Sequence, residues 1–270
     1  MKKVFVLGLA AVLSFSFLTG CGGASASENK LVVGASTSPH AEILEAAKPL
    51  LKEKGYELEI KEFSDYVIPN TSLENKELDA NYFQHQPYLD DFNTNNGTHL
   101  VSVAAIHYEP LGIYAGKSSD LKQIKEGAVI AIPNDTTNEA RALLLLESQN
   151  LIQLNKGAGL AATVNDVESN PYKIEFKEID AAQLVRTLPD VDFAVINGNY
   201  ALQGDLKVSD ALAKEEADSV AAQTYANVFV VREGDETRED IKALVEVLQS
   251  KEIAEFISEK YQGSVVSMVE

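Results

Sequence analysis

The sequence predicts an α/β protein built from two lobes, and three observations support this prediction. Short apolar runs of strand length alternate with amphipathic stretches of helix length. The chain opens with a strand, a helix and a second strand, an order that favours a parallel sheet with a crossover helix. The same alternation recurs in the second half of the chain with its own apolar segments. About 240 residues follow the N-terminal segments, which is enough for one large or two medium-sized domains.

The first lobe begins with a buried strand at Leu31–Ala35. Apolar residues at helical spacing predict a helix over Ala41–Lys54, and Gly55 ends it. Tyr56–Phe63 alternates apolar with charged residues, which is typical of a strand. The next expected elements are a loop and helix within Asp65–Leu78 and strands at Leu78–Phe83 and Val101–Ile106.

Pro110 separates two strand-like runs, which suggests that the chain crosses from one lobe to the other at His107-Tyr108-Glu109-Pro110. A strand at Tyr225–Arg232 is expected to make the return crossing, and one long helix at Glu239–Lys260 follows it. The elements expected between the crossings are strands at Leu111–Ala115, Ala128–Ile132, Tyr172–Ile179 and Phe193–Ile196, and helices at Leu121–Ile124, Arg141–Gln149 and Ala181–Leu188.

Two α/β lobes joined by two crossings are the architecture of a solute-binding protein, in which the ligand binds in the cleft between the lobes. The expected boundaries place residues 30–108 and 226–270 in lobe 1 and residues 109–225 in lobe 2.

The N-terminus has the pattern of a secretion signal, with a basic start at Met1–Lys3 and an apolar segment at Val4–Leu18 that is too short to span a membrane. Small residues then precede Cys21, as in the lipobox of bacterial lipoproteins. We expect a signal peptide at residues 1–20, lipidation of Cys21 on the extracytoplasmic face of the cell membrane, and a flexible tether at residues 21–29. The alternative is a plain secretory signal with a chance cysteine.

Cys21 is the only cysteine, so the folded part has no disulfide, no zinc–thiolate site and no cysteine nucleophile. The net charge is −18, and removal of residues 1–20, which contain two lysines and no acid, makes it −20. This charge disfavours nucleic acid as a partner.

Aromatic side chains gather in Asp79–Leu89, which reads DANYFQHQPYL in a chain that has no tryptophan. Rigid rings with polar tips suit the wall of a ligand pocket, although burial in the core explains such a cluster equally well. The candidates are Phe83, His85 and Tyr88, together with Tyr66, which follows the second strand and could instead be packed in a loop.

The segment Ile132–Arg141 ends a buried strand and begins a helix. Asn138 and Arg141 are three residues apart and share a helix face, where Arg141 could bind a carboxylate through two hydrogen bonds. The alternative is that Asn134 or Thr137 caps the helix while Arg141 pairs with an acid on the surface.

Two further asparagines stand at positions where a cleft is expected. Asn197 follows the buried strand Phe193–Ile196, although it could equally belong to a turn made of turn-forming residues. Asn227 lies inside a predicted strand, where asparagine is disfavoured, so it either faces solvent at an edge or offers its amide to a partner.

Several segments of the chain, in this order, carry a resemblance to a known family: the lipobox, Asp65-Tyr66-Val67, Pro69-Asn70, Asp79–Leu89, Ile132–Leu146 and Val195-Ile196-Asn197. On these segments the chain resembles the NlpA family of methionine-binding lipoproteins of ABC importers. The resemblance implies a type II periplasmic-binding-protein fold that clamps L-methionine between its lobes and presents it to a permease and its ATPase. By matching positions, it implies that Tyr66, Phe83, His85 and Tyr88 enclose the thioether, that Arg141 and Asn138 hold the carboxylate, and that Asn197 and Asn227 hold the polar end.

His107, Glu109 and Asn199 do not match the family pattern, which leaves a methionine-containing dipeptide such as glycyl-methionine as an alternative ligand. An enzyme is disfavoured because the sequence has no H-E-x-x-H, G-x-S-x-G or G-x-x-x-x-G-K-[ST] motif. A metal-binding lipoprotein is disfavoured because there is no histidine-rich loop. We therefore expect no cofactor and no metal.

Overall fold

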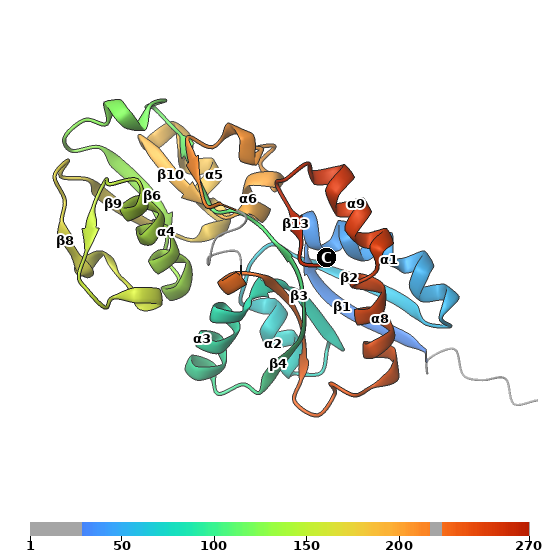
Figure 1. Ribbon diagram of the computed structural model, residues 1–270. Coiled ribbons are helices and arrows are strands. Elements are labelled where there is room, and N and C mark those ends of the chain that lie inside the picture. Colours follow the sequence, from blue (N-terminus) through green and yellow to red (C-terminus); the bar gives the residue numbers. More distant parts are fainter. Residues whose placement is uncertain (1–28, 217–222, 270) are drawn as a thin grey trace, which may run out of the picture.

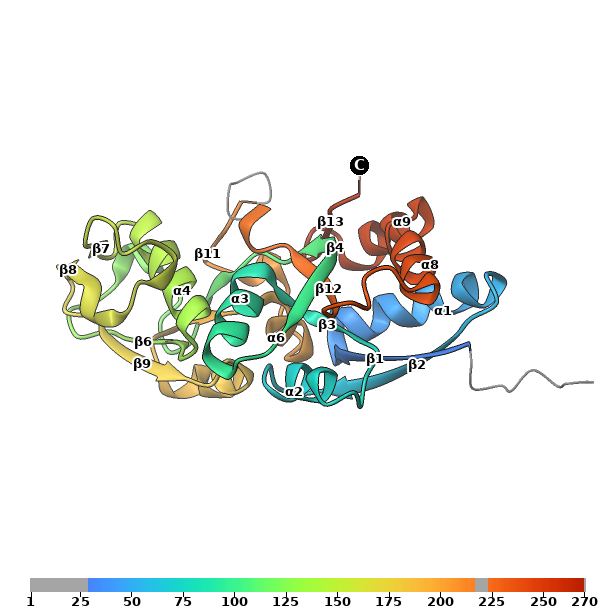
Figure 2. The same ribbon diagram turned by 90° about the horizontal axis from the view of Figure 1, so that it is seen from below.

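The computed structural model describes residues 29–216 and 223–269, which fold into two lobes (Figure 1). The predicted signal peptide, Cys21 and the tether up to residue 28 lie outside the described residues. Each lobe is built on its own β-sheet with helices packed against it, so the predicted two-lobed α/β fold is confirmed. A second view, turned by 90°, shows the two sheets joined end to end through the middle of the molecule (Figure 2).

The first lobe combines both ends of the described chain. Its six strands are β1 (Lys30–Ser36), β2 (Glu57–Phe63), β3 (Ala80–His85), β4 (Leu100–Tyr108), β12 (Asn227–Arg232) and β13 (Val266–Ser267), in the order β13-β4-β12-β3-β1-β2. The strand β1 pairs in parallel with β2 and β3, as its opening pattern predicts. The strand β12 pairs antiparallel with both β3 and β4, so the returning chain occupies the middle of the sheet.

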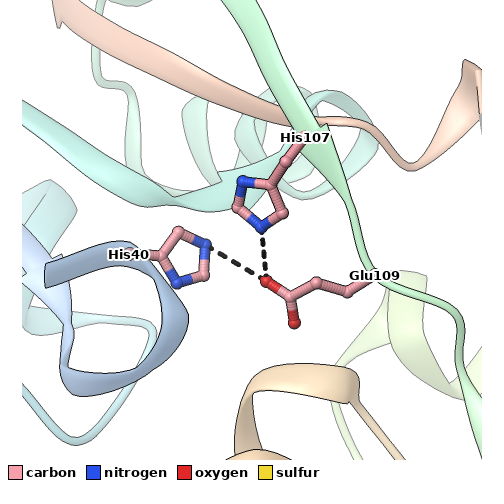
Figure 3. Close-up of side chains that lie close together, drawn as sticks. All are labelled: His40, His107 and Glu109. Carbon is pink, nitrogen blue, oxygen red and sulfur yellow. Dashed lines mark hydrogen bonds and ion pairs between the residues drawn. The ribbon is translucent and has the colours of Figure 1, made fainter. Parts of the chain in front are cut away.

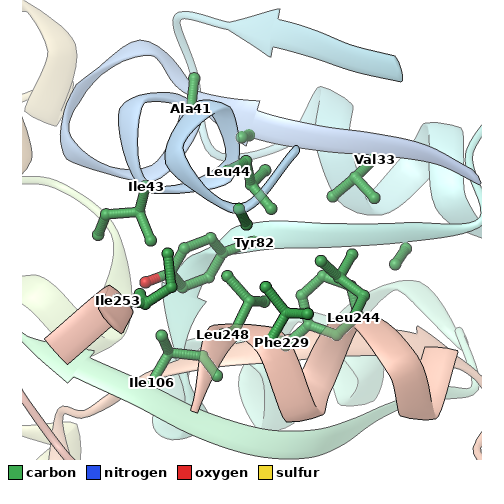
Figure 4. Close-up of a cluster of buried hydrophobic side chains, with 14 of the residues drawn as sticks. Val33, Ala41, Ile43, Leu44, Tyr82, Ile106, Phe229, Leu244, Leu248 and Ile253 are labelled. Atoms are coloured by element: carbon green, nitrogen blue, oxygen red, sulfur yellow. The ribbon is translucent and has the colours of Figure 1, made fainter. Parts of the chain in front are cut away.

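Five helices surround this sheet: α1 (Glu42–Glu53), α2 (Ile68–Glu74), α3 (Gln86–Asn96), α8 (Glu239–Leu248) and α9 (Lys251–Tyr261). Helices α1, α8 and α9 cover one face, where their apolar side chains pack against the sheet (Figure 4). Tyr82 and Phe229 lie at the centre of this core and are fully buried. Burial of a large side chain of this kind stabilises the fold by about 1.5–3 kcal/mol.

The prediction of one helix over Glu239–Lys260 is wrong, because the chain forms α8 and α9 with a break at residues 249–250. The hydroxyl of Ser250 accepts a hydrogen bond from the N–H of Ile253 and caps the start of α9. A serine that caps a helix satisfies a free N–H group, and this local hydrogen bond competes with a continuous helix. Apolar spacing alone continued smoothly across the break and did not reveal it.

The second lobe is built on a five-stranded sheet. Its strands are β5 (Gly112–Ala115), β6 (Val129–Pro133), β9 (Glu175–Ile179), β10 (Phe193–Ile196) and β11 (Ala213–Lys214), in the order β11-β5-β10-β6-β9. Helices α4 (Thr136–Ser148), α5 (Leu184–Thr187) and α6 (Gly198–Gln203) pack around it. A separate two-stranded ribbon of β7 (Gln153–Leu154) and β8 (Val167–Ser169) lies beside α4. The strand β10 coincides with the predicted strand.

The two sheets are connected by the chain that runs from β4 through Glu109–Leu111 into β5, and the chain returns between β11 and β12. The segment that joins the two sheets thus overlaps residues 107–110, where the crossing is predicted. None of the helices in the described ranges combines the length and the apolar character needed to cross a membrane.

Candidate functional site

A cavity lies between the two lobes and is lined by side chains from both. All eight residues proposed from the sequence line it, and so do Gln84, Glu109, Gly198 and Asn199. Tyr66, Phe83, His85, Tyr88 and Asn227 come from the first lobe, whereas Asn138, Arg141 and Asn197 come from the second. The tertiary structure therefore brings together residues that are up to 161 positions apart, from Tyr66 to Asn227.

Three aromatic rings form one wall of the cavity. The ring centroid of Tyr66 lies 5.8 Å from that of Phe83 and 5.7 Å from that of Tyr88, distances typical of favourable aromatic pairs. The hydroxyl of Tyr88 donates to the carbonyl of Tyr66, which holds the loop after β2 against α3. The aromatic stretch thus divides, because Tyr82 points into the core of the first lobe while Phe83 and His85 line the cavity.

Helix α4 is capped by Asp135, so the alternative that Asn134 or Thr137 provides the cap is wrong. Asp135 has the extended backbone of an N-cap and accepts from the N–H of Asn138 at 3.0 Å. Its carboxylate also accepts from Nδ2 of Asn138 at 2.8 Å. This second bond fixes the amide of Asn138, because a carboxylate can only be matched by the NH₂ group.

The orientation of Asn138 determines the hydrogen bonding of two neighbours. Its Oδ1 accepts from Nδ2 of Asn197 at 2.7 Å and from Nε2 of His85 at 3.2 Å. The other ring nitrogen of His85, Nδ1, accepts from the N–H of Tyr88. Burial and the positive charge of Arg141 lower the pKa of His85 to about 3, so the ring is neutral, as these two bonds require.

This chain of bonds leaves Oδ1 of Asn197 buried without a hydrogen-bond partner, and Nδ2 of Asn199 is in the same situation. Both residues line the cavity. A buried polar atom without a partner costs about 1–3 kcal/mol, so these two atoms mark positions where a polar ligand group would be favourable. The cavity therefore presents one unsatisfied acceptor and one unsatisfied donor.

Arg141 lines the cavity but also belongs to a buried ion pair. Its Nε and Nη2 donate to the two carboxylate oxygens of Glu215 at 2.9 and 2.6 Å, and Nη2 also donates to the carbonyl of Glu109. The guanidinium lies 4.3 Å from the ring centroid of Tyr225. The alternative of a surface ion pair is wrong, since Arg141 and Glu215 are only 4% and 8% exposed. One edge of the guanidinium is thus occupied by hydrogen bonds within the protein.

Asn227 lies on a central strand rather than at an exposed edge, and its side chain is buried. Its Oδ1 is 2.9 Å from Nε2 of His40. The donor atoms of His40, His107 and Glu109 lie within 4.8 Å of one another, so this group could hold a metal ion on chemical grounds. Its hydrogen bonds are considered further below. Glu109 is not among the eight site residues selected from the sequence, where its only signal is that it departs from the family pattern.

A two-lobed α/β fold with an enclosed cavity between the lobes defines a solute-binding protein. Residues 31–269 match the model of the family described as NlpA lipoprotein, so the chain belongs to the NlpA lipoprotein family. It is 41% identical to the methionine-binding lipoprotein MetQ of Bacillus subtilis (strain 168), over the full length of both chains.

Solved structures agree with this assignment. A nutrient-binding protein from Burkholderia cenocepacia, solved bound to methionine, is 44% identical, with a TM-score of 0.84 over 88% of this chain and 99% of that one. An ABC transporter periplasmic substrate-binding protein from Coxiella burnetii is 41% identical, with a TM-score of 0.83 over 88% of this chain and 99% of that one. The resemblance inferred from the sequence is confirmed at the level of the family.

Proposed function

We propose that this protein is a lipid-anchored receptor that captures methionine between its lobes and delivers it to an ABC permease and its ATPase, without catalysing a reaction. The observation that carries the proposal is a cavity between the lobes that combines an aromatic wall with Arg141. The names of the relatives in Bacillus and Burkholderia support methionine as the ligand. The lobes would divide at the residue boundaries expected from the sequence, and Cys21 would carry the lipid.

The aromatic wall suits a thioether. A sulfur atom beside an aromatic ring is stabilised by about 0.3–1.5 kcal/mol for each contact. Tyr66, Phe83 and Tyr88 offer three such rings. His85 is held neutral at the edge of this wall, so it adds contact area without adding charge.

The polar side of the cavity suits the other end of an amino acid. Glu215 occupies one edge of the Arg141 guanidinium, and Nη1 makes no hydrogen bond to the described residues, so it can receive a ligand carboxylate. The unsatisfied Nδ2 of Asn199 can donate to the same carboxylate, and the amides of Asn138, Asn197 and Asn227 complete the polar wall.

Calorimetric titration of the purified protein tests the proposal. We expect heat on addition of L-methionine and weaker binding of norleucine, which has a methylene in place of the sulfur. Titration with glycyl-methionine tests the dipeptide alternative, and a mass spectrum of ligand released from denatured protein identifies what the cell supplied. Binding of glycyl-methionine alone, or heat only with zinc, would contradict the assignment of free methionine.

A further inference from the structure

We propose that Glu109 receives the α-ammonium group of the ligand, so that the site selects a free amino acid over ligands in which that nitrogen is missing or acylated. This inference rests on the proposed function and adds a residue and a specificity to it. It is carried by the position of Glu109, by the direction of its hydrogen bonds and by the balance of charge around it.

Glu109 lies in the segment that joins the two sheets, and its carboxylate is buried at the wall of the cavity. Gly198, at the start of α6, makes room for it. A Cβ atom at that position would lie 2.7 Å from Cβ of Glu109 and 2.9 Å from its Oε2. The approach of these residues also places Glu109 next to Asn197, which precedes Gly198 and carries the unsatisfied acceptor oxygen.

The carboxylate of Glu109 lies beside two histidine rings, those of His107 and His40 (Figure 3). The buried hydroxyl of Tyr82 bonds to Nδ1 of His107, and Nε2 of His107 lies 2.6 Å from Oε1 of Glu109. When Glu109 is ionised it can only accept, so Nε2 carries the proton of the neutral ring and the Tyr82 hydroxyl donates to Nδ1. Burial lowers the pKa of His107 to about 3, which agrees with a neutral ring. His107 therefore orients the carboxylate without neutralising its charge.

The second histidine in Figure 3 also brings no positive charge to Glu109. Nε2 of His40 lies 3.5 Å from Oε1 of Glu109 and 2.9 Å from the amide oxygen of Asn227. Burial lowers the pKa of His40 to about 4, so this ring is neutral as well.

Arg141 is a cation that interacts with Glu109, but its ion pair is with Glu215. Glu109 is thus a buried carboxylate that faces a cavity without a cation of its own, which is an unfavourable arrangement. Burial accordingly raises the pKa of Glu109, although the charge of Arg141 and a hydrogen bond from the N–H of Asn199 oppose the shift. An ammonium group in the cavity would supply the missing charge.

The arrangement fits an α-amino acid in particular. Arg141 donates to the main-chain carbonyl of Glu109 at 3.0 Å, so the guanidinium and the carboxylate belong to neighbouring parts of the wall. An α-amino acid carries its carboxylate and ammonium on one carbon atom and can reach both. In glycyl-methionine, the methionine nitrogen is an uncharged amide, and the ammonium lies three bonds further away.

A metal ion bound by His40, His107 and Glu109 explains the geometry less well. The 2.6 Å between Nε2 of His107 and Oε1 of Glu109 is a hydrogen-bond distance. Two ligands of a tetrahedral zinc ion, each about 2.0–2.1 Å from the metal, lie about 3.3 Å apart. We therefore interpret these side chains as a hydrogen-bond network that positions Glu109.

The test compares methionine with 4-(methylthio)butanoate, which lacks only the amino group, by calorimetry on the wild type and on Glu109→Gln. The glutamine oxygen can still accept from His107, so the variant keeps the network but loses the charge. We expect the wild type to prefer methionine, and Glu109→Gln to lose at least about tenfold of that preference by weakening methionine binding alone. Thermal unfolding verifies that the variant is folded.

Glu139→Gln is the matched control, because Glu139 is a buried carboxylate that accepts from the N–H of Val164 and does not line the cavity. It should keep the wild-type preference. Glu109→Asp, which retains the charge on a shorter side chain, should show part of the wild-type preference for methionine. An unchanged preference in Glu109→Gln, or an equal loss for both ligands, would overturn the role of Glu109 even where the wild type binds methionine. A wild type that binds neither ligand would instead refute the proposed function.

Discussion

Replacement of Arg141 should weaken methionine binding and should also destabilise the protein, and the structure allows the two effects to be separated. Arg141→Ala removes the proposed anchor of the ligand carboxylate, so we expect the affinity to fall by at least about tenfold. The same change leaves the buried carboxylate of Glu215 without its cation. Breaking a buried ion pair from one side costs about 3–5 kcal/mol, which is a large part of the 5–15 kcal/mol that stabilises a typical domain.

A double variant, Arg141→Met with Glu215→Gln, removes both charges. The glutamine oxygen can still accept from the hydroxyl of Tyr108 and the N–H of Leu111, which both bond to Glu215 in the wild type. Neutral replacement of both members of a buried pair is often close to neutral in stability. We therefore expect the double variant to recover most of the stability lost in Arg141→Ala.

Urea denaturation measures the free energy of unfolding of the wild type and both variants, and calorimetric titration measures their affinity for methionine. If Arg141 anchors the ligand, the double variant is stable but binds as weakly as the single variant. A double variant that binds methionine as tightly as the wild type would show that Arg141 serves only the ion pair, and the reasoning would be refuted.

Three further predictions concern the aromatic wall and the buried acids. Phe83→Ala should lose affinity for methionine more than for alanine in calorimetric titrations. The control is Phe92→Ala, which removes a ring of the same cluster that lies outside the cavity and should not show this selective loss. Equal losses of affinity for the two ligands in Phe83→Ala would mean that Phe83 is only a core residue. Burial opposes ionisation of Glu215, but Arg141 outweighs it and holds the pKa of Glu215 below the usual 4.5. The stability that this ion pair contributes is therefore complete above about pH 4.5 and is lost as the pH falls through the lowered pKa of Glu215. When the stability of Glu215→Gln is measured as the pH is lowered, this loss should be absent. The pKa of Glu109 is raised, so its effect on stability depends on pH in the opposite direction. Its ionisation opposes folding above pH 4.5, so Glu109→Gln should be at least as stable as the wild type without ligand at pH 7, and a lower melting temperature would contradict this.

The agreement between the sequence and the structure is best where a signal is local. Phe193–Ile196 is an uninterrupted apolar run, and it forms a strand with the predicted limits. The helix predicted at Glu239–Lys260 failed because its apolar spacing continued across Ser250, whose capping hydrogen bond outweighed it. The local sequence does not single out the cap of α4, because four cap-forming residues, Asn134 to Thr137, stand in a row and only the backbone conformation selects Asp135 rather than Asn134 or Thr137.

The candidate site depended on both kinds of information. The residue types and their places after strands and at a helix start were sufficient to select the eight residues that line the cavity. Their partners were not predictable. Glu215 lies 74 positions from Arg141, and nothing in its local sequence distinguishes it from the other 40 acids.

The sequence by itself determined the alternation of strands and helices, the point of crossing between the lobes and the chemistry of the residues near it, because apolar periodicity, proline and capping residues act over a few positions. Only the tertiary structure decided which charges meet. The pairing of Arg141 with Glu215, and the neutral histidines that leave Glu109 facing the cavity, arise from side chains of distant segments that are buried together. Charges interact strongly only when they are close and shielded from water, and that proximity is a property of the folded chain.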